Sequence, residues 1–310
     1  MHLWGLNAGN PAVFLGTGPC TLDGLQYATC STTANTDARR RLSLERPRDG
    51  DKIGPLGIID DGGTSTYHAM LLSLERRAAK GVSLSTNYTF SHCINPYTTT
   101  QALKYPPDDT YLDPNNRNLD RGNCGSDRRH LVTLTSLWQT PKFSNKAVNI
   151  VASDWRISGI YRYTSGRPLD VTSGVDQALN GIAAGGQNSS ARQRPNQILA
   201  DAYVDRSGGP LTQWLNRNAF VNPAVGSYGN VGYNQFVGPS NWGIDAAVSR
   251  TFNVREMQRL EFRAEAFNLT NSFMPGNPAT AINGNTFGVL RTQSTTVTSR
   301  VLQFALKYVF

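Results

Sequence analysis

The residues best suited to proton-transfer chemistry in this sequence are its four histidines, His2, His68, His92 and His130. His92 and His130 flank one stretch without strand periodicity, and Asp127 lies close to His130. An imidazole beside a carboxylate can act as a general base, and it can activate a serine when the groups meet. The sequence contains neither a G-x-S-x-G nor an H-E-x-x-H motif. We therefore interpret these residues as polar groups at the rim of a loop and predict no catalytic residue.

The cysteines are the other residues with reactive side chains, and they stand at positions Cys20, Cys30, Cys93 and Cys124. None belongs to a C-x-x-C motif, so the sequence predicts neither a zinc ribbon nor a thioredoxin-type site. The nearest-neighbour pairs, Cys20 with Cys30 and Cys93 with Cys124, each fall within one predicted loop. Disulfides in loops are typical of exported proteins, and four unpaired thiols are the alternative. We expect no metal and no cofactor.

The composition differs from that of an ordinary soluble enzyme. Only 17% of the 310 residues are charged, 29 are glycine, and no apolar run is long enough for a transmembrane helix. Transmembrane β-strands remain compatible with this composition because they show about ten residues of alternation and no hydropathy peak. The formal charge of +8 comes from dispersed basic residues, and they are not interleaved with aromatic residues as in a nucleic-acid-binding module. We expect no nucleic-acid partner.

The clearest element is the strand predicted at 300–310. Large apolar residues occupy every second position there, and the residues between them are mostly polar or small. The apolar set is Leu302, Phe304, Leu306, Tyr308 and Phe310. A period of two places the two sets on opposite faces of one strand. A final strand that is apolar outward and polar inward is typical of a transmembrane β-barrel. It also resembles the C-terminal assembly signal of bacterial outer-membrane proteins.

Similar alternation predicts six further strands. With the last one, the ranges are 66–77, 82–92, 128–139, 154–165, 242–252, 259–269 and 300–310. In the sixth strand one face carries Arg259, Glu261, Arg263 and Glu265, and the other face is wholly apolar. We expect these four charged residues to face a lumen. The fold class predicted is all-β: an antiparallel up-and-down meander of about seven strands that forms an open segment of a transmembrane β-barrel with long extracellular loops.

The connections between these strands alternate in length. They are short at 78–81 and 253–258, of medium length at 140–153, long at 93–126 and 271–298, and very long at 166–240. Transmembrane barrels combine short periplasmic turns with long extracellular loops, whereas a soluble Greek-key fold has no reason to do so. Aromatic residues near strand ends fit an interfacial girdle; they are Tyr88, Trp138, Trp155, Tyr163, Trp242 and Tyr308. Residues 1–64 show turn chemistry and little periodicity, so we predict an extracellular-type loop region there and a barrel segment over 65–310.

Several segments resemble recurring strands of TonB-dependent receptors of the Oar-like type. They are Tyr67 to Arg77, Asn87 to His92, Asp127 to His130, Trp155 to Tyr161 with Ser165 to Pro168, and Leu260 to Asn271. The resemblance covers residues 65–310 and implies a 22-stranded barrel with a plugged lumen, energised through TonB for the passage of a large solute. The chain departs from that family in its seven strands, the absence of a plug, and an N-terminus without the features of a signal peptide. We therefore expect a C-terminal fragment cut within an extracellular loop.

The resemblance also implies the partners and the location. We expect the cell outer membrane of a Gram-negative bacterium, contact with its lipid and lipopolysaccharide, and assembly by the barrel-assembly machinery. The TonB system would act only through the missing N-terminal part, and the solute is a large molecule of unknown identity. Two alternatives remain open: a small outer-membrane enzyme of the protease or lipase type, and a secreted β-rich adhesin.

Overall fold

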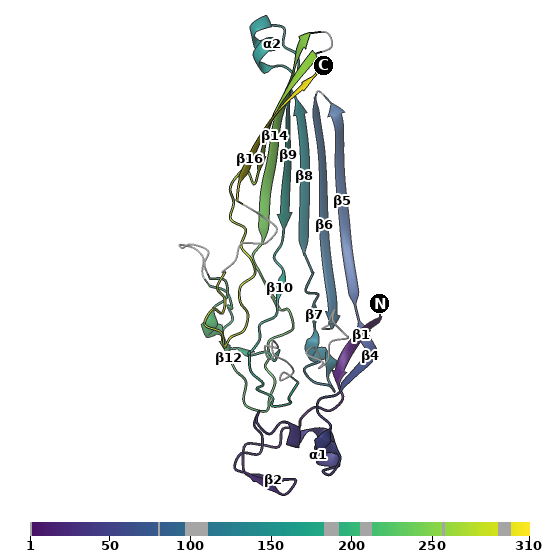
Figure 1. Ribbon diagram of the computed structural model, residues 1–310, viewed down its shortest axis with the longest axis vertical. Coiled ribbons are helices and arrows are strands. Elements are labelled where there is room, and N and C mark those ends of the chain that lie inside the picture. Colours follow the sequence, from purple (N-terminus) through teal and green to yellow (C-terminus); the bar gives the residue numbers. More distant parts are fainter. Residues whose placement is uncertain are drawn as a thin grey trace.

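The computed structural model describes residues 2–79, 81–96, 111–182, 192–204, 213–255, 258–290 and 299–310. Its dominant element is one tall antiparallel sheet, which we call the wall (Figure 1). The wall consists of β5 (Thr66–Ala79), β6 (Val82–Pro96), β8 (His130–Gln139), β9 (Trp155–Thr164), β14 (Asn241–Arg255), β15 (Gln258–Phe267) and β16 (Val301–Val309). Each strand pairs with the wall strand that precedes it in the sequence, and the short β7 (Arg121–Asn123) pairs with β6. This open up-and-down meander confirms the predicted fold class.

The register of the wall keeps one face apolar from strand to strand. One row of cross-strand neighbours crosses six strands and is wholly apolar: Val82, Trp138, Ile157, Val248, Ala264 and Phe304. A neighbouring row on the opposite face runs through Glu75, Ser85, Thr135, Ile160 and Asp245. Because side chains alternate strictly between faces, a slip of one residue at any pair would mix these rows. The pairing therefore produces an apolar face and a mainly polar face; Leu71, Leu131, Leu137 and Ile160 are among the apolar exceptions on the latter.

The connections at the two ends of the wall differ in size. The pairs β5–β6, β8–β9 and β14–β15 are joined at one end, where the C-terminus also lies, and the longer connections gather at the other end (Figure 1). We call these the short-connection end and the long-connection end. Gly81 makes the first short turn at φ +80°, and a Cβ there would lie 2.4 Å from the carbonyl oxygen of Gln139. Only glycine fits that position, because other residues rarely adopt positive φ and the backbone is close.

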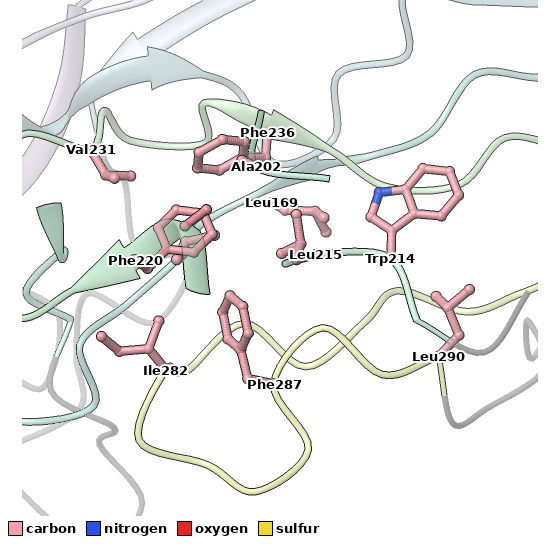
Figure 2. Packing of buried hydrophobic residues seen from close by; sticks show 12 residues of the cluster. Leu169, Ala202, Trp214, Leu215, Phe220, Val231, Phe236, Ile282, Phe287 and Leu290 are labelled. Carbon is pink, nitrogen blue, oxygen red and sulfur yellow. The ribbon is translucent and has the colours of Figure 1, made fainter. Parts of the chain in front are cut away.

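At the long-connection end, the loops pack around a hydrophobic core of their own (Figure 2). The core combines residues of the 165–240 connection with residues of the 268–300 connection: Leu169, Val171, Ala202, Trp214, Leu215, Ala219, Phe220, Val231, Phe236, Ile282, Phe287 and Leu290. Phe220 packs edge-on against both Phe236 and Phe287. Four two-residue strands bracket it: β10 (Pro168–Leu169) pairs with β13 (Phe236–Val237), and β11 (Asn196–Gln197) with β12 (Phe220–Val221). The long connections are therefore a folded unit, which we call the loop assembly.

The interpretation of residues 1–64 as one exposed loop is wrong for their local structure. β1 (His2–Ala8) pairs with β4 (Gly57–Thr64), and β2 (Cys20–Leu22) pairs with β3 (Leu25–Tyr27). The helix α1 (Arg41–Glu45) and 3-10 turns at Asp37–Arg39 and Gly50–Lys52 lie between them. Two further 3-10 turns occur in the loop assembly, at Arg117–Asp120 and Arg217–Ala219. The N-terminal segment is held by backbone and buried polar hydrogen bonds between distant residues, which leave no periodic pattern in the sequence.

The second α-helix, α2 (Lys146–Ala152), lies in the connection between β8 and β9 at the short-connection end (Figure 1). The sequence interpretation has a turn of medium length at 140–153 and no helix. In the part of the chain that the structure describes, no helix combines the length and the apolar character needed to cross a membrane.

Candidate solute-contacting surface

The polar face of the wall carries the four charged residues predicted to face a lumen. Glu261 is opposite Lys307 on β16, Arg263 is opposite Ala305, and Glu265 is opposite Gln303. Arg263 forms an ion pair with Glu265. On the neighbouring strands Arg162 donates to Asp245 across a distance of 2.8 Å. The structure thus places charges of both signs on one face, which is suited to contact with water or a polar solute rather than with hydrocarbon.

The residues of the predicted assembly signal lie on the other face. Leu302, Phe304, Leu306 and Tyr308 all point to the apolar side of β16, and Phe310 follows at the end of the chain. Leu306 is 69% exposed, and its cross-strand neighbour is the apolar Phe262. An apolar face this large is costly in water and is expected where lipid covers it.

Aromatic residues concentrate near both ends of the apolar face. Tyr88, Tyr163 and Trp242 belong to one cross-strand row toward the long-connection end, while Trp155 and Phe252 lie toward the short-connection end. The stretch from Trp242 to Phe252 extends over about 33 Å at ~3.3 Å per residue. At the strand tilt of about 45° typical of membrane barrels, this corresponds to a height of ~23 Å, close to the usual apolar band of about 25 Å.

Two of the motifs that resemble receptor strands lie where strands meet their loops. Ser91 holds the end of the Asp127–His130 motif, because its amide donates to the Arg129 carbonyl and its hydroxyl donates to the Arg128 carbonyl. This turn is the reason that β8 begins at His130 rather than at the predicted position 128. In the Ser165 to Pro168 motif, Gly166 lies so close to the backbone of Gly238 that a Cβ would be 1.8 Å from the Gly238 carbonyl oxygen. These motifs therefore fix the geometry of the rim.

β15 ends at Phe267, two residues before the predicted boundary at 269, and Asn268 follows it. Asn268 adopts φ +49°, a left-handed conformation that asparagine tolerates better than most residues. Its amide donates to the Asp245 carboxylate at 2.9 Å, and its side-chain oxygen accepts from the Ser272 amide at 3.0 Å. Asp245 therefore joins the polar face of the wall to the start of the last long loop.

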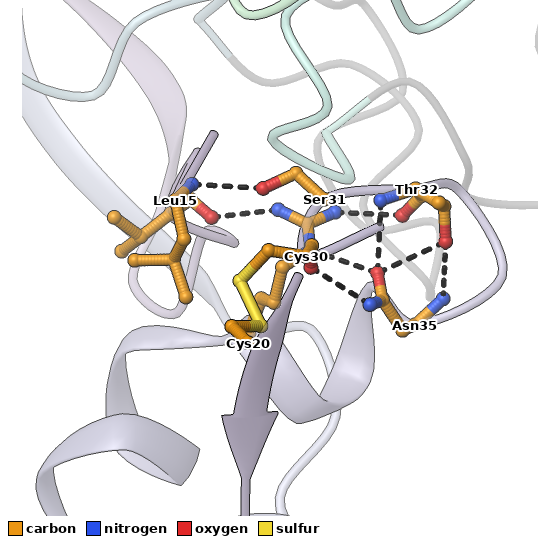
Figure 3. Close-up of a disulfide and its surroundings, with 8 residues drawn as sticks. Leu15, Cys20, Cys30, Ser31, Thr32 and Asn35 are labelled. Atoms are coloured by element: carbon orange, nitrogen blue, oxygen red, sulfur yellow. Dashed lines mark hydrogen bonds between the residues drawn. A yellow bond between two sulfur atoms is a disulfide. The ribbon is translucent and has the colours of Figure 1, made fainter. Parts of the chain in front are cut away.

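A fully buried arginine holds the N-terminal segment against the loop assembly. Arg39 donates to the carbonyls of Val13, Thr32 and Leu179 and to the side-chain oxygen of Asn35. Burial lowers the pKa of Arg39 from its usual range, with the nearby Asp176 acting in the opposite direction. Asn35 also accepts from the Thr32 amide and donates to the Cys30 carbonyl (Figure 3). Because Leu179 belongs to the long β9–β14 connection, this arginine joins two segments that are far apart in the sequence.

Both cysteine pairs form disulfides in the structure. Cys20 and Cys30 close the hairpin of β2 and β3, with Cα atoms 5.2 Å apart (Figure 3). Cys93, near the end of β6, is joined to Cys124 across the next long connection, with Cα atoms 5.3 Å apart. Asp127 reinforces the second disulfide because its carboxylate accepts from the Cys93 amide at 2.9 Å. Each disulfide constrains a loop segment at the long-connection end.

A buried cluster of charges lies within the loop assembly. Arg194 donates to Asp120 across 2.8 Å, and both side chains are buried. Arg194 also donates to the carbonyls of Val231 and Leu119. Asp120 accepts from the Leu112 amide with its second oxygen. The sequence analysis identified none of these residues, because single charged residues in a Gly- and Asn-rich connection give no signal that they are buried.

Asp170 lies among the charges of this cluster, and its pKa is shifted. Its Oδ1 atom is shielded from solvent and has no hydrogen-bond partner among the described residues, although the residue as a whole is partly exposed. Burial raises the pKa of Asp170 to about 6, while Arg194 and Arg192 act to lower it and Asp120 acts to raise it. Burial and the charge of Asp170 also raise the pKa of Tyr233 to about 12. The carboxyl group of Asp170 therefore changes charge near pH 6.

We expect the loop assembly to lose stability as the pH rises from about 4 to about 6. In the folded state the pKa of Asp170 is about 6, above the ordinary 3.8. Between these two values the folded state binds more protons than the unfolded state, so the free energy of unfolding decreases as the pH rises. A shift of this size corresponds to at most about 3 kcal/mol. Asp170→Asn should abolish the decrease and raise the unfolding temperature of the loops at pH 7.5, measured by tryptophan fluorescence. Asp51→Asn, at an exposed site, is the control; an unchanged pH profile in Asp170→Asn would contradict the assignment.

The sequence places His92, His130 and Asp127 around one loop, and in the structure their side chains contact other partners. His92 lies within 3.0 Å of the Asn123 side-chain oxygen, and His130 lies 2.9 Å from the Tyr88 hydroxyl. Asp127 contacts the Cys93 amide and Arg129 instead of either ring. In the described residues there is no group of three or more His, Cys, Asp or Glu that could hold a metal ion.

The sheet, the loop assembly and the N-terminal segment together match one known family. A family model described as Outer membrane beta barrel domain matches residues 1–303. Comparison with curated proteins and with solved structures finds no match. The matched range includes the wall up to the beginning of β16 as well as both long connections of the loop assembly.

Proposed function

This chain belongs to the outer membrane beta barrel domain family, and on that premise we propose that it supplies wall strands and solute-contacting loops to a TonB-dependent receptor. The family places the protein in the outer membrane of a Gram-negative bacterium. In that membrane the apolar face contacts lipid and the polar face contacts the barrel interior. The proposed activity is the TonB-energised passage of a large solute, with no catalytic role for the chain.

The observation that carries this proposal is the loop assembly at the end of the polar face. Its twelve-residue hydrophobic core and its buried Asp120–Arg194 pair fix the long connections in one arrangement. A barrel that served only as a membrane anchor would not need connections with their own core. Loops positioned on a rigid scaffold commonly carry binding residues. The arrangement favours a preformed solute-contacting surface beside a hydrophilic interior.

The proposed partners follow from the same surfaces. The apolar face would contact outer-membrane lipid and lipopolysaccharide, and the alternating residues of β16 would be recognised by the barrel-assembly machinery. The TonB system would act through a plug inside the barrel, as in the receptors that the sequence resembles. The loop assembly would contact the solute first, so its residues rather than those of the wall would determine specificity.

Transport is tested with three strains: one with the native gene, one with the gene deleted, and one with an inactive TonB system. We expect at least one large solute to disappear from the medium of the first strain and to persist in both others, measured by mass spectrometry of the spent medium. The deletion strain complemented with the native gene is the control. A solute whose uptake needs this protein and not TonB would contradict energised transport, and the absence of any solute that needs this protein would contradict transport altogether.

A further inference from the structure

The connection of residues 140–154 is a structured element at the short-connection end of the wall. Its helix α2 starts after Asn145, whose side-chain oxygen accepts from the amides of Ala147 and Val148 at 3.0 and 3.3 Å. Asn149 then accepts from the Phe143 amide at 3.0 Å, which folds the preceding segment onto the helix. The side chains of Asn145 and Asn149 thus hold the seven-residue helix and the segment before it in one conformation.

The outer side of α2 is apolar and exposed. At 3.6 residues per turn, Ala147, Val148, Ile150 and Val151 share one side of the helix, and Asn149 lies on the other. Ile150 is 63% exposed and Val151 is 69% exposed. A cluster of exposed β-branched residues on so short a helix is unfavourable in water, because nothing in the described protein removes it from solvent.

The helix is attached to the lipid-facing side of the wall. Arg250 and Trp155 are cross-strand neighbours on the apolar face, and both reach the last turn of α2. The Arg250 guanidinium donates to the carbonyls of Val151, at 2.9 Å, and Ile150, and the Trp155 ring N–H donates to the Val151 carbonyl at 2.8 Å. Arg250 also lies over the rings of Trp155 and Phe252. These contacts satisfy helix-end carbonyls and give a cation on the apolar face a polar partner.

We propose that α2 is an interfacial membrane helix that lies in the inner leaflet of the outer membrane. Its apolar side would continue the lipid-facing surface of the wall, to which Arg250 and Trp155 fix it. Lys142, four residues before the helix, and Lys146, its first residue, are exposed and would contact lipid phosphates. Within the connection Asp154 is the only acidic residue, so the charge suits an anionic phospholipid surface. The proposal rests on the outer-membrane location and is independent of transport.

The test uses the protein purified from outer membranes and reconstituted in vesicles of phosphatidylethanolamine and phosphatidylglycerol. No cysteine is free among the described residues, so Ile150→Cys can be labelled with an environment-sensitive fluorophore. Leu72→Cys, on the apolar face, and Ser85→Cys, on the polar face, are matched controls. Two spin-labelled lipids serve as quenchers, one labelled near the headgroup and one near the chain end.

The shallow quencher should reduce the fluorescence at position 150 roughly twofold more than the deep one, because interfacial helices lie about 5–10 Å into the headgroup boundary. The probe at position 72 should be quenched by both lipids, and the probe at position 85 by neither. A probe at position 150 that stays water-exposed and unquenched would overturn the proposal. A probe that is shielded from water but not quenched by lipid would overturn it as well, since a second copy or another protein would then cover the helix.

Discussion

Leu306→Arg should remove most of the folded, heat-modifiable protein from isolated outer membranes, whereas Ala305→Arg should leave most of it. Leu306 stands opposite Phe262 on the apolar face, and Ala305 stands opposite Arg263 on the polar face. An arginine on the lipid side near the bilayer midplane costs about 2–4 kcal/mol in transmembrane barrels. Both variants are expressed from the complete gene, and the folded fraction is measured by electrophoresis with and without heating.

The strand register predicts a small loss of stability for the control variant Ala305→Arg as well. An arginine at position 305 would face Arg263, and directly opposite like charges cost roughly 0.2–1 kcal/mol. Glu261 and Glu265 flank that site and would offset part of this repulsion. Gln303→Arg, opposite Glu265, avoids it and is the cleaner polar-face control. Equal loss of folded protein in Leu306→Arg and Gln303→Arg would mean that the two faces of β16 meet the same environment, and the assignment of a lipid face would be wrong.

Deletion of Phe310 separates two roles of the last strand. Phe310 follows β16, and no strand pairing includes it, so its removal leaves the wall contacts intact. A reduced folded fraction in this deletion would therefore indicate recognition during assembly rather than loss of wall stability. The measurement is the same as for position 306, and the rest of the chain is left unchanged so that only the C-terminus differs.

The wall could be predicted from sequence because its faces repeat at a period of two. The strand predicted at 66–77 is β5 at Thr66–Ala79, and that predicted at 300–310 is β16 at Val301–Val309. Differences arise at strand ends, where local contacts decide the boundary. Asn268, for example, leaves the extended conformation at the place where it binds Asp245. Alternation therefore predicts the faces, and side-chain hydrogen bonds determine the ends.

The loop assembly could not be predicted by the same reasoning. Its core joins Leu169, Phe220 and Phe287, which stand in segments without periodicity and far apart in the sequence. The burial of Arg39 could not be predicted either. A basic residue next to other arginines is expected at the surface, and only the fold shows the backbone carbonyls to which Arg39 donates. The helix α2 was missed because its four apolar positions are too few to establish a helical period. Long-range packing leaves no local pattern.

Arg194→Met should have the second large effect and should destabilise the loop assembly by roughly 3–5 kcal/mol, because it leaves the buried Asp120 carboxylate without its ionic partner. Methionine retains much of the arginine volume, so the charge is the main change. Arg162→Met is the matched control: its ion pair with Asp245 has the same N–O distance of 2.8 Å, but the two side chains are 59% and 25% exposed. Exposed pairs contribute about 0–1 kcal/mol. Hydrogen exchange of the amides of β11 and β12 measures the difference.

Asp120→Asn combined with Arg194→Met distinguishes a buried charge from a simple loss of contacts. The asparagine can still accept from the Leu112 amide, as Asp120 does at 2.7 Å, and it carries no charge that needs a partner. Removal of both charges of a buried pair is often nearly neutral, whereas removal of one is costly. The double variant should therefore recover most of the amide protection that Arg194→Met loses. The double variant could instead stay as unprotected as the single variant. That result would mean that the loops depend on the packing of the arginine stem and on its hydrogen bonds to the Val231 and Leu119 carbonyls, and not on the charge of Asp120.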